Sequence, residues 1–287
     1  GKAMVQSALQ TGRNAPASRK AGTRRVLQKL LAGASSGAAA LIINAIPLAA
    51  PAWAQAVNGA PTVVFGANAP VRAPGSDTIT VNAHDALVDW TATDAGGVFL
   101  PTGNTLTFNA DTSVSGAYTV LNRVSSSAAG ASPLQINGTV NSGDAGRIWF
   151  YNPTGWVVGS SGAFNVGSLL LTASPVTINA GNPDGQKFAG ANGAITLGQA
   201  PNAGASITVQ NGAQITTVAP GSYVALVAPR VVQGGTVSAN GSVAYVGAEA
   251  ATLTVNNGLF NITVDTGTTD ANGVVHTGTT TGAAATF

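Results

Sequence analysis

The sequence predicts an all-β body, and two observations indicate it. Of 287 residues only 8% are charged, whereas 45% are hydrophobic and 37 are Gly; Val, Ile and Thr favour strands, and Gly and Asn favour tight turns. From Val57 onward short apolar alternations of period two recur, and no helical period is sustained over three turns. Each alternation is therefore expected to be a strand with one buried face. The clearest runs are 78–81, 106–108, 148–151, 195–197, 207–209, 243–246 and 253–255.

Asn-Gly pairs between these runs leave two arrangements of the strands open. Such pairs usually form antiparallel hairpins, which would give a sandwich or a barrel. From Ala191, however, Asn-Gly and Ile or Val alternations repeat loosely, at intervals near the roughly 20 residues that a solenoid coil needs. This repetition favours a solenoid, in which stacking buries the aliphatic residues that a single coil leaves exposed. The pairs begin at Asn58, Asn137, Asn192, Asn211, Asn240, Asn257 and Asn272.

Residues 1–54 are predicted to be an extended signal peptide, helical or disordered. A basic stretch over 19–29 precedes an uncharged run over 30–50, and a small-x-small site follows. We predict cleavage between Ala54 and Gln55, with cleavage two residues later as the alternative. A transmembrane anchor is the other interpretation, since the uncharged run is about long enough to span a bilayer.

Charge and cysteine content exclude several classes of function. Seven of the twelve Lys and Arg residues lie in the first 29 residues, and all ten acidic residues come later. Five basic against ten acidic residues leave the body with a net charge of about −5, which excludes a basic surface for nucleic acid. The chain has no Cys, so zinc ribbons, thiol catalysis and a disulfide framework are excluded.

Several motifs follow one another in a fixed order between residues 118 and 174. They are Asn122-Arg123-Val124, then Ile136-Asn137-Gly138, then the strand Ile148–Tyr151 running into Asn152-Pro153-Thr154-Gly155, and the apolar strand 163–172. This series resembles the two-partner secretion, or haemagglutination-activity, domain of filamentous-haemagglutinin-type exoproteins. The sequence departs from the family pattern at Thr154 and Trp156, where the family has Asn and Ile. The family's Asn-Pro-Asn-Leu motif has no counterpart.

The resemblance implies the full fold class and the division of the chain. The expected fold is a right-handed parallel β-helix with short extra-helical β elements. The expected domains are the signal peptide 1–54, a two-partner secretion domain over 55–175, and continuing β-helix coils over 176–287 that are truncated at the C-terminus.

The resemblance also implies a non-catalytic, secretion-targeting role in a large bacterial exoprotein, expected to be an adhesin. The expected partners are the inner-membrane export machinery and a cognate outer-membrane barrel transporter with periplasmic modules. A host-surface or glycan ligand would bind the downstream chain. The expected location is the cell surface or the medium of a Gram-negative bacterium, reached through the periplasm.

The residues that the resemblance marks are Asn122, Arg123, Asn152, Pro153 and Gly155. Residues 152–155 also predict a β-turn by themselves, because Pro fixes φ at the second position and Gly is permissive at the last. This turn is expected to reverse the chain between two apolar strands. It either folds the domain or, as the resemblance implies, is recognised by the transporter. Arg123 is expected to be a solvated or locally paired charge, or else to cap carbonyls at a coil end or anchor a loop.

No catalytic site, cofactor or metal site is predicted. His84 lies near four acidic residues, but these are spread along the chain, whereas hard cations need six to eight oxygen ligands; an exposed acidic loop is expected. The four acids are Asp77, Asp85, Asp89 and Asp94. Neither a nucleophile elbow nor a phosphate-binding loop is present. The alternative function is a secreted β-helical polysaccharide-degrading enzyme, which would gather acids and a basic residue on one coil face.

Overall fold

The computed structural model describes residues 55–92, 96–126, 132–256 and 259–286, which belong to one compact unit. The predicted signal peptide lies outside the described residues, as does Ala54, and Gln55 is the first residue described. Within these ranges, the structure contains no helix with the length and hydrophobicity of a membrane span.

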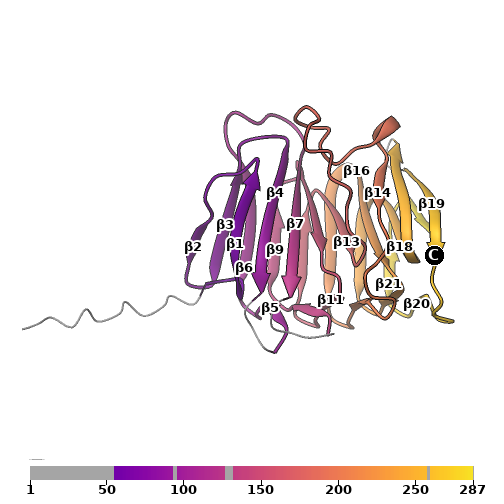
Figure 1. Cartoon of the computed structure of the whole chain (residues 1–287). Helices are drawn as coiled ribbons and strands as arrows, with labels where there is room; N and C mark the ends of the chain where they lie inside the picture. Colours follow the sequence, from indigo (N-terminus) through magenta and orange to yellow (C-terminus); the bar gives the residue numbers. More distant parts are fainter. Residues whose placement is uncertain (1–54, 93–95, 127–131, 257–258, 287) are drawn as a thin grey trace, which may run out of the picture. The chain divides into compact units, whose positions relative to one another are not determined.

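The described chain winds through three parallel ladders of strands, one strand per ladder in each coil (Figure 1). Ladder 1 contains β4 (Asp85–Ala92), β7 (Tyr118–Ser126), β10 (Gly146–Tyr151), β13 (Ser168–Thr172), the second part of β16 (Gln214–Ala228), the middle of β18 (Thr236–Asn256) and β22 (Ala284–Thr286). Ladder 2 contains β5 (Val98–Leu100), β8 (Leu134–Ile136), β11 (Gly155–Val158), β15 (Ser206–Val209), β17 (Arg230–Gln233) and β20 (Val274–His276). Ladder 3 contains β3 (Ser76–Val81), β6 (Thr105–Ala110), β9 (Thr139–Ser142), β12 (Ala163–Val166), the first parts of β16 and β18, and β21 (Thr279–Thr281).

A few short elements lie outside the coils. β1 (Gly59–Phe65) pairs antiparallel with β4, and β2 (Val71–Ala73) pairs antiparallel with β3. β14 (Ile195–Leu197) and β19 (Leu259–Gly267) pair antiparallel with the end of β18, and a single 3₁₀ turn, η1 (Ala191–Gly193), is the only helix among the described residues. The predicted parallel β-helix with short extra-helical β elements is therefore confirmed.

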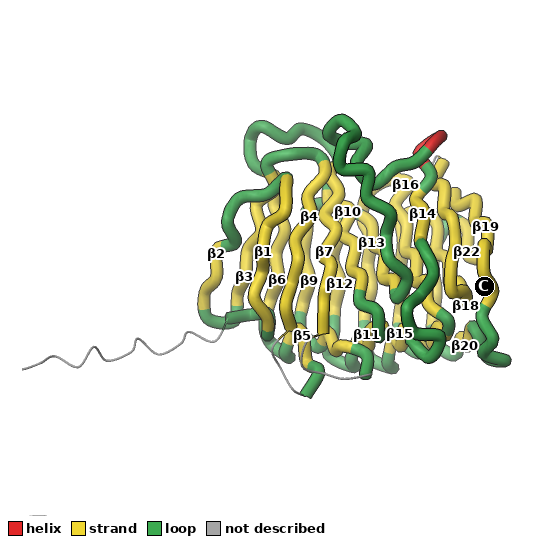
Figure 2. Tube along the Cα trace, in the orientation of Figure 1, coloured by secondary structure: helices red, strands yellow, loops and turns green. Residues whose placement is uncertain are grey.

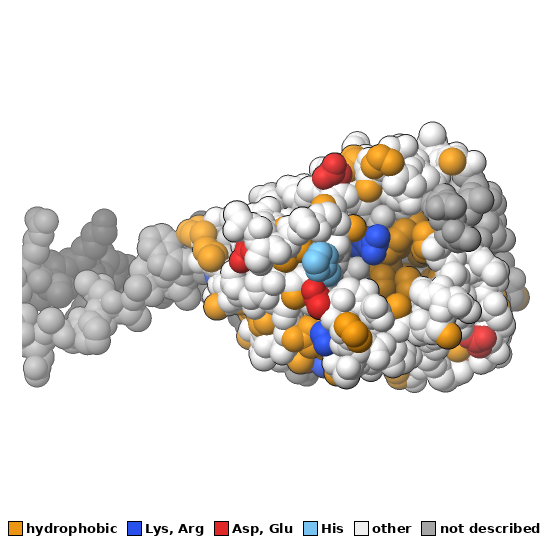
Figure 3. Space-filling view, turned by 90° about the horizontal axis from the view of Figure 1, so that it is seen from above, with side chains coloured by type: hydrophobic (Ala, Val, Ile, Leu, Met, Phe, Trp, Pro, Cys, Tyr) orange, Lys and Arg blue, Asp and Glu red, His pale blue; other side chains and the backbone are white. Residues whose placement is uncertain are grey.

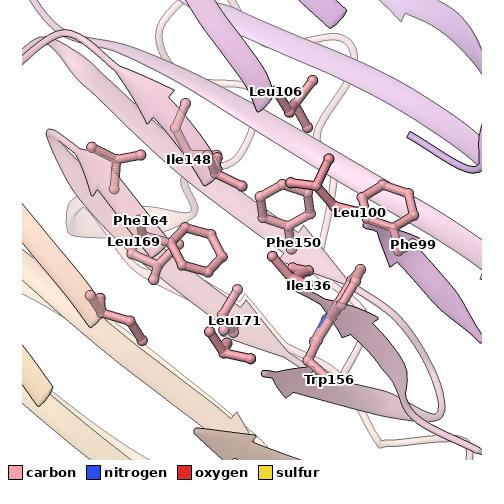
Figure 4. Close-up of a cluster of buried hydrophobic side chains, with 14 of the residues drawn as sticks. Phe99, Leu100, Leu106, Ile136, Ile148, Phe150, Trp156, Phe164, Leu169 and Leu171 are labelled. Atoms are coloured by element: carbon pink, nitrogen blue, oxygen red, sulfur yellow. The ribbon is translucent and has the colours of Figure 1, made fainter. Parts of the chain in front are cut away.

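Inward-pointing side chains form one core along the inside of the coils. The strands alternate, so that in β10 Ile148 and Phe150 point inward while Trp149 points outward. An aromatic stack runs through this core: Phe150 contacts Trp156 and Phe164 edge to face, with ring centroids 5.5 and 6.2 Å apart (Figure 4). Burial of each such side chain stabilises the fold by roughly 1.5–3 kcal/mol.

A second core lies on the outer face of ladder 1. Residues 173–205, which we call the excursion, cover this second core. The excursion leaves the β-helix after β13 and returns to it at β15, and it is seen among the loops above the strands in Figure 2. Phe188 of the excursion packs on Trp149, with ring centroids 5.5 Å apart, and on Phe65, 6.0 Å away. Ladder 1 is consequently apolar on both faces where the excursion lies.

The expected exposed acidic loop is wrong. Asp77 lies on β3 and is fully buried, and Asp85 lies on β4 and is 4% exposed. Asp89 also lies on β4, whereas Asp94 is outside the described residues. The buried carboxylates are tolerated because each accepts hydrogen bonds from partners that only the folded chain brings near.

Candidate functional site

The residues that the resemblance marks form what we call the candidate motif. Its two halves, Asn122-Arg123 and the turn at 152–155, lie on neighbouring coils. The parallel register of β7 and β10 places Phe150 beside Asn122 and Tyr151 beside Arg123. Asn152 follows directly where β10 ends. The fold therefore brings together residues that are about thirty positions apart in the sequence.

Asn122 points into the core. It is fully buried, and its Oδ1 accepts a hydrogen bond from the indole Nε1 of Trp90, 3.0 Å away on the preceding coil. Its Nδ2 donates to the backbone oxygen of Trp149 on the following coil, at 3.2 Å. One amide thus connects three successive coils, and this explains a polar residue within an otherwise apolar interior.

Arg123 points outward from the same strand. Its Nε and Nη2 donate to the two carboxylate oxygens of Asp89 on β4, both at 2.7 Å. Because of this fork, the pKa of Arg123 is raised above its ordinary value. The expectation that Arg123 caps carbonyls at a coil end is wrong, since it lies within a strand; the locally paired charge is what the structure has.

The turn at residues 152–155 is a corner between two ladders. The N–H of Gly155 donates to the backbone oxygen of Asn152 at 3.0 Å, as the predicted β-turn requires. The expected reversal of the chain is wrong, however, because β10 and β11 belong to different sheets, and each pairs in parallel with strands of its own ladder. The corner needs Gly155: its φ is +92°, and a Cβ there would lie 1.9 Å from the backbone oxygen of Ser206.

Asn152 holds this corner from the inside. Its side chain is fully buried, and its Nδ2 donates to the Oγ1 of Thr154 and the backbone oxygen of Gly155, both at 2.7 Å. Thr154, which stands where the related family has Asn, therefore contributes a hydrogen-bond acceptor to the turn. Among the described residues, two buried side-chain polar atoms have no hydrogen-bond partner, namely Oδ1 of Asn152 and Nε1 of Trp156.

Most of the candidate residues are out of reach in the folded domain. Asn122 and Asn152 are 0% exposed, and Gly155 is buried. Pro153 is partly exposed, and the side chain of Arg123 is 42% exposed. A protein that binds the folded surface can therefore contact only two of the five.

An ion pair near the N-terminus was not found by sequence reasoning. The buried carboxylate of Asp77 accepts hydrogen bonds from Nε and Nη2 of Arg72 and from the backbone N–H of Val57. Arg72 also donates to the backbone oxygens of Val57 and Gly59, at 2.7 and 2.6 Å. We call these four residues the N-terminal bracket, because they fasten residues 57–59 to the first coil. An unusually isolated Arg close to an Asp in the sequence was the only signal.

A second missed cluster fastens the excursion to the coils. The carboxylate of Asp184 accepts hydrogen bonds from the backbone N–H groups of His84 and Asp85, each at 2.9 Å, and lies 2.9 Å from Nδ1 of His84. In return, Asp85 accepts a hydrogen bond from the backbone N–H of Lys187 at 2.8 Å. We call Asp184, His84, Asp85 and Lys187 the excursion clasp.

The pKa values of the clasp follow from these contacts. The hydrogen bond to Asp184 raises the pKa of His84. Burial raises the pKa of Asp184, but the hydrogen bonds from His84 and Asp85 outweigh it, so this pKa lies below its ordinary value. Burial raises the pKa of Asp85. Across the described ranges the structure contains no group of three or more His, Cys, Asp or Glu side chains arranged to hold a metal ion.

Comparisons with known proteins agree with this architecture. The family model of the TPS (two-partner secretion) secretion domain matches residues 99–286. A solved structure, the HMW1 secretion domain from Haemophilus influenzae, superimposes with a TM-score of 0.53 at 17% sequence identity, covering 74% of this chain and 50% of that one. The chain thus spans half the length of that relative. No curated protein matched significantly. The matched range, together with the coiled parallel ladders that carry the Asn122 and Asn152 motifs, shows that the chain belongs to the TPS secretion domain family.

Proposed function

We propose that this chain targets a large exoprotein for export through an outer-membrane barrel partner, and that the partner recognises the chain before it folds. Membership in the TPS secretion domain family supports the targeting role. The burial of Asn122, Asn152 and Gly155 supports recognition of an unfolded chain. In an extended chain these side chains are accessible, whereas in the coils they serve packing and hydrogen bonding.

The parallel ladders suit folding at the far side of the membrane. Each new coil places its strands on the exposed edges of the coil before it and buries two or three aliphatic side chains, each worth roughly 1.5–3 kcal/mol. A chain that has formed its first coils outside would therefore be held against retreat. On this proposal Asn122 and Asn152 have two successive roles, first as recognised residues and then as connectors of coils.

The ion pair of Arg123 and Asp89 offers a sharp test. Either Arg123→Gln or Asp89→Asn removes the same half-exposed pair, so both should lower the free energy of unfolding by a similar amount, at most about 1 kcal/mol. Only Arg123 lies in the candidate motif. We therefore expect Arg123→Gln to reduce release into the medium while Asp89→Asn leaves release unchanged. Equal release of the two variants, at matched expression, would contradict recognition of Arg123.

Asn152 and Pro153 extend the same test to the turn. Asn152→Ala removes two buried hydrogen bonds and should lower stability by about 1–3 kcal/mol, whereas Pro153→Ala changes a partly exposed residue. Release and the circular dichroism of the purified protein are measured for both. Reduced release of Pro153→Ala with an unchanged spectrum supports recognition; release that tracks stability alone in both variants supports a purely structural turn.

The remaining parts of the proposal concern the whole protein. We propose cleavage between Ala54 and Gln55, a Gram-negative cell-surface or secreted destination reached through the periplasm, and an adhesive role of the intact exoprotein. N-terminal sequencing of the released protein tests the cleavage position directly. Incubation of the purified protein with pectin-like polymers tests the alternative enzyme, which would release products.

A further inference from the structure

One basic side chain of the body differs from the other four. Arg72, Arg123 and Arg230 each form an ion pair with an Asp, and Lys187 donates to two backbone oxygens. The side chain of Arg147 is exposed and forms neither an ion pair nor a hydrogen bond with any described residue. Its guanidinium is therefore available to a ligand.

Arg147 lines a cavity of about 510 Å³ between ladder 1, the excursion and the bend of β16. Figure 3, seen from above, shows a hollow with an apolar floor and a basic side chain beside it. The lining includes Trp149 of β10, Phe188 of the excursion and Tyr223 of β16. The indole Nε1 of Trp149 donates to the Tyr223 hydroxyl at 2.8 Å, which fixes these two aromatic side chains.

The positive charge of Arg147 reaches into this cavity. Burial raises the pKa of Tyr223 to about 12, and the charge of Arg147 acts in the opposite direction. The cavity is within the size range of small-molecule sites, which lies at roughly 300–1,000 Å³. The cation therefore adjoins a preformed space of suitable volume.

Other groups in the lining select among anions. Asp144 is an exposed carboxylate of the lining, and Asp85 contributes a second, buried one. Two carboxylates against one guanidinium disfavour a dianion such as a phosphate ester. The exposed carboxylate of Asp144 does provide an acceptor for hydroxyl groups, and Thr119 and Ser168 add polar side chains to the lining. A ligand with one carboxylate and several hydroxyls matches this arrangement.

We infer that this cavity binds a sugar acid, whose carboxylate pairs with the guanidinium of Arg147 while its hydroxyls meet Asp144 and the neighbouring polar groups. Planar pairing of guanidinium with carboxylate provides both charge and geometry. The site belongs to the folded domain and does not depend on the proposed export function.

Galacturonate, which has one carboxylate and several hydroxyls, is the probe, and its methyl ester is the matched neutral control of nearly the same shape. Binding to the purified protein is followed by the NMR shift of the Trp149 indole N–H, with those of Trp90 and Trp156 as internal references because both lie in the inner core. We expect saturable shifts of the Trp149 signal with galacturonate and none with the ester. The affinity should fall as salt is added, because salt screens the attraction between the guanidinium and the carboxylate.

Substitutions separate the site from general effects. Arg147→Gln should weaken binding at least about tenfold, because a charged hydrogen bond is worth that factor, and Arg147→Lys should keep part of the affinity. Arg230→Gln changes a basic residue of ladder 2 outside the cavity lining and should leave binding unchanged. No shift at about 10 mM probe, a concentration at which a ligand with a dissociation constant of about 1 mM would be mostly bound, would overturn the inference. Equal binding of the ester, or of the Arg147→Gln variant, would overturn it as well.

Discussion

The N-terminal bracket should contribute a large part of the stability of the first coil. Asp77 is 0% exposed and accepts three hydrogen bonds, two of them from Arg72, whose side chain is 14% exposed. Asp77→Ala leaves a nearly buried guanidinium without its carboxylate. Breaking such a pair costs about 3–5 kcal/mol, so we expect a loss of that size in the free energy of unfolding.

A double substitution separates the charge from the packing. Arg72→Met with Asp77→Leu removes both charges and fills the space with apolar atoms, and replacements of this kind are often neutral. It also removes the donors to the backbone oxygens of Val57 and Gly59. We expect a loss smaller than that of Asp77→Ala alone, and hence a favourable coupling between the two residues.

Urea unfolding followed by tryptophan fluorescence measures these effects. Trp90 is a suitable reporter, because the guanidinium carbon of Arg72 lies 5.8 Å from the centre of its ring. The slope of the transition must stay unchanged if the whole unit unfolds together, a condition that solenoids do not always meet. A loss below about 1 kcal/mol for Asp77→Ala, the range of exposed pairs, would refute the reasoning.

Two further predictions concern the corner and the clasp. Gly155→Ala should lower the free energy of unfolding distinctly more than Gly103→Ala. Both positions have a positive φ, which costs about 1–2 kcal/mol for a residue with a Cβ, but a Cβ at Gly103 meets open space whereas one at Gly155 meets a backbone oxygen. Equal thermal shifts of the two variants would contradict the close approach. Within the excursion clasp, the pair of His84 and Asp184 should be strongest between the ordinary pKa values of Asp184 and His84, 3.8 and 6.5. The contribution of His84 is lost as pH rises through its raised pKa, and that of Asp184 as pH falls through its lowered pKa. Hydrogen exchange of the excursion across this range measures both, and a His84 titration midpoint below 6.5 would contradict it.

The strands were predictable from sequence because burial on one face imposes a period of two. All seven predicted runs lie within strands. Their position in the fold was less predictable: 195–197 and 253–255 have the same alternation as the coils but form the antiparallel sheet beside them. An alternating pattern indicates that one face of a strand is buried, but it does not indicate which part of the protein covers that face.

Asn-Gly pairs were an imperfect guide to the coils. Asn240-Gly241 lies within β18, and of the described Asn residues only Asn192 has a positive φ. At Gly241 the requirement is close approach, since a Cβ would lie 1.9 Å from the backbone oxygen of Ser222. A corner between two ladders requires Gly either because φ is positive or because there is no space for a Cβ. The spacing of the corners therefore does not follow the spacing of the Asn-Gly pairs.

The candidate site was less predictable than the strands, because it depends on contacts between residues that are distant in the sequence. The order of motifs marked Asn122 and Asn152, but not that both side chains point inward. Lys187 reaches Asp85 from 102 positions away, and the cavity beside Arg147 exists because the excursion folds back over ladder 1. The domain boundary predicted at 175/176 remains a prediction.

Dependence of release on the barrel partner tests the central claim most directly. The full chain is expressed with and without a cognate outer-membrane barrel transporter, and the protein is quantified in the medium and in the periplasm. The account predicts folded protein in the medium only when the transporter is present, and retention in the periplasm without it. Equal release in both strains would contradict the proposed targeting role.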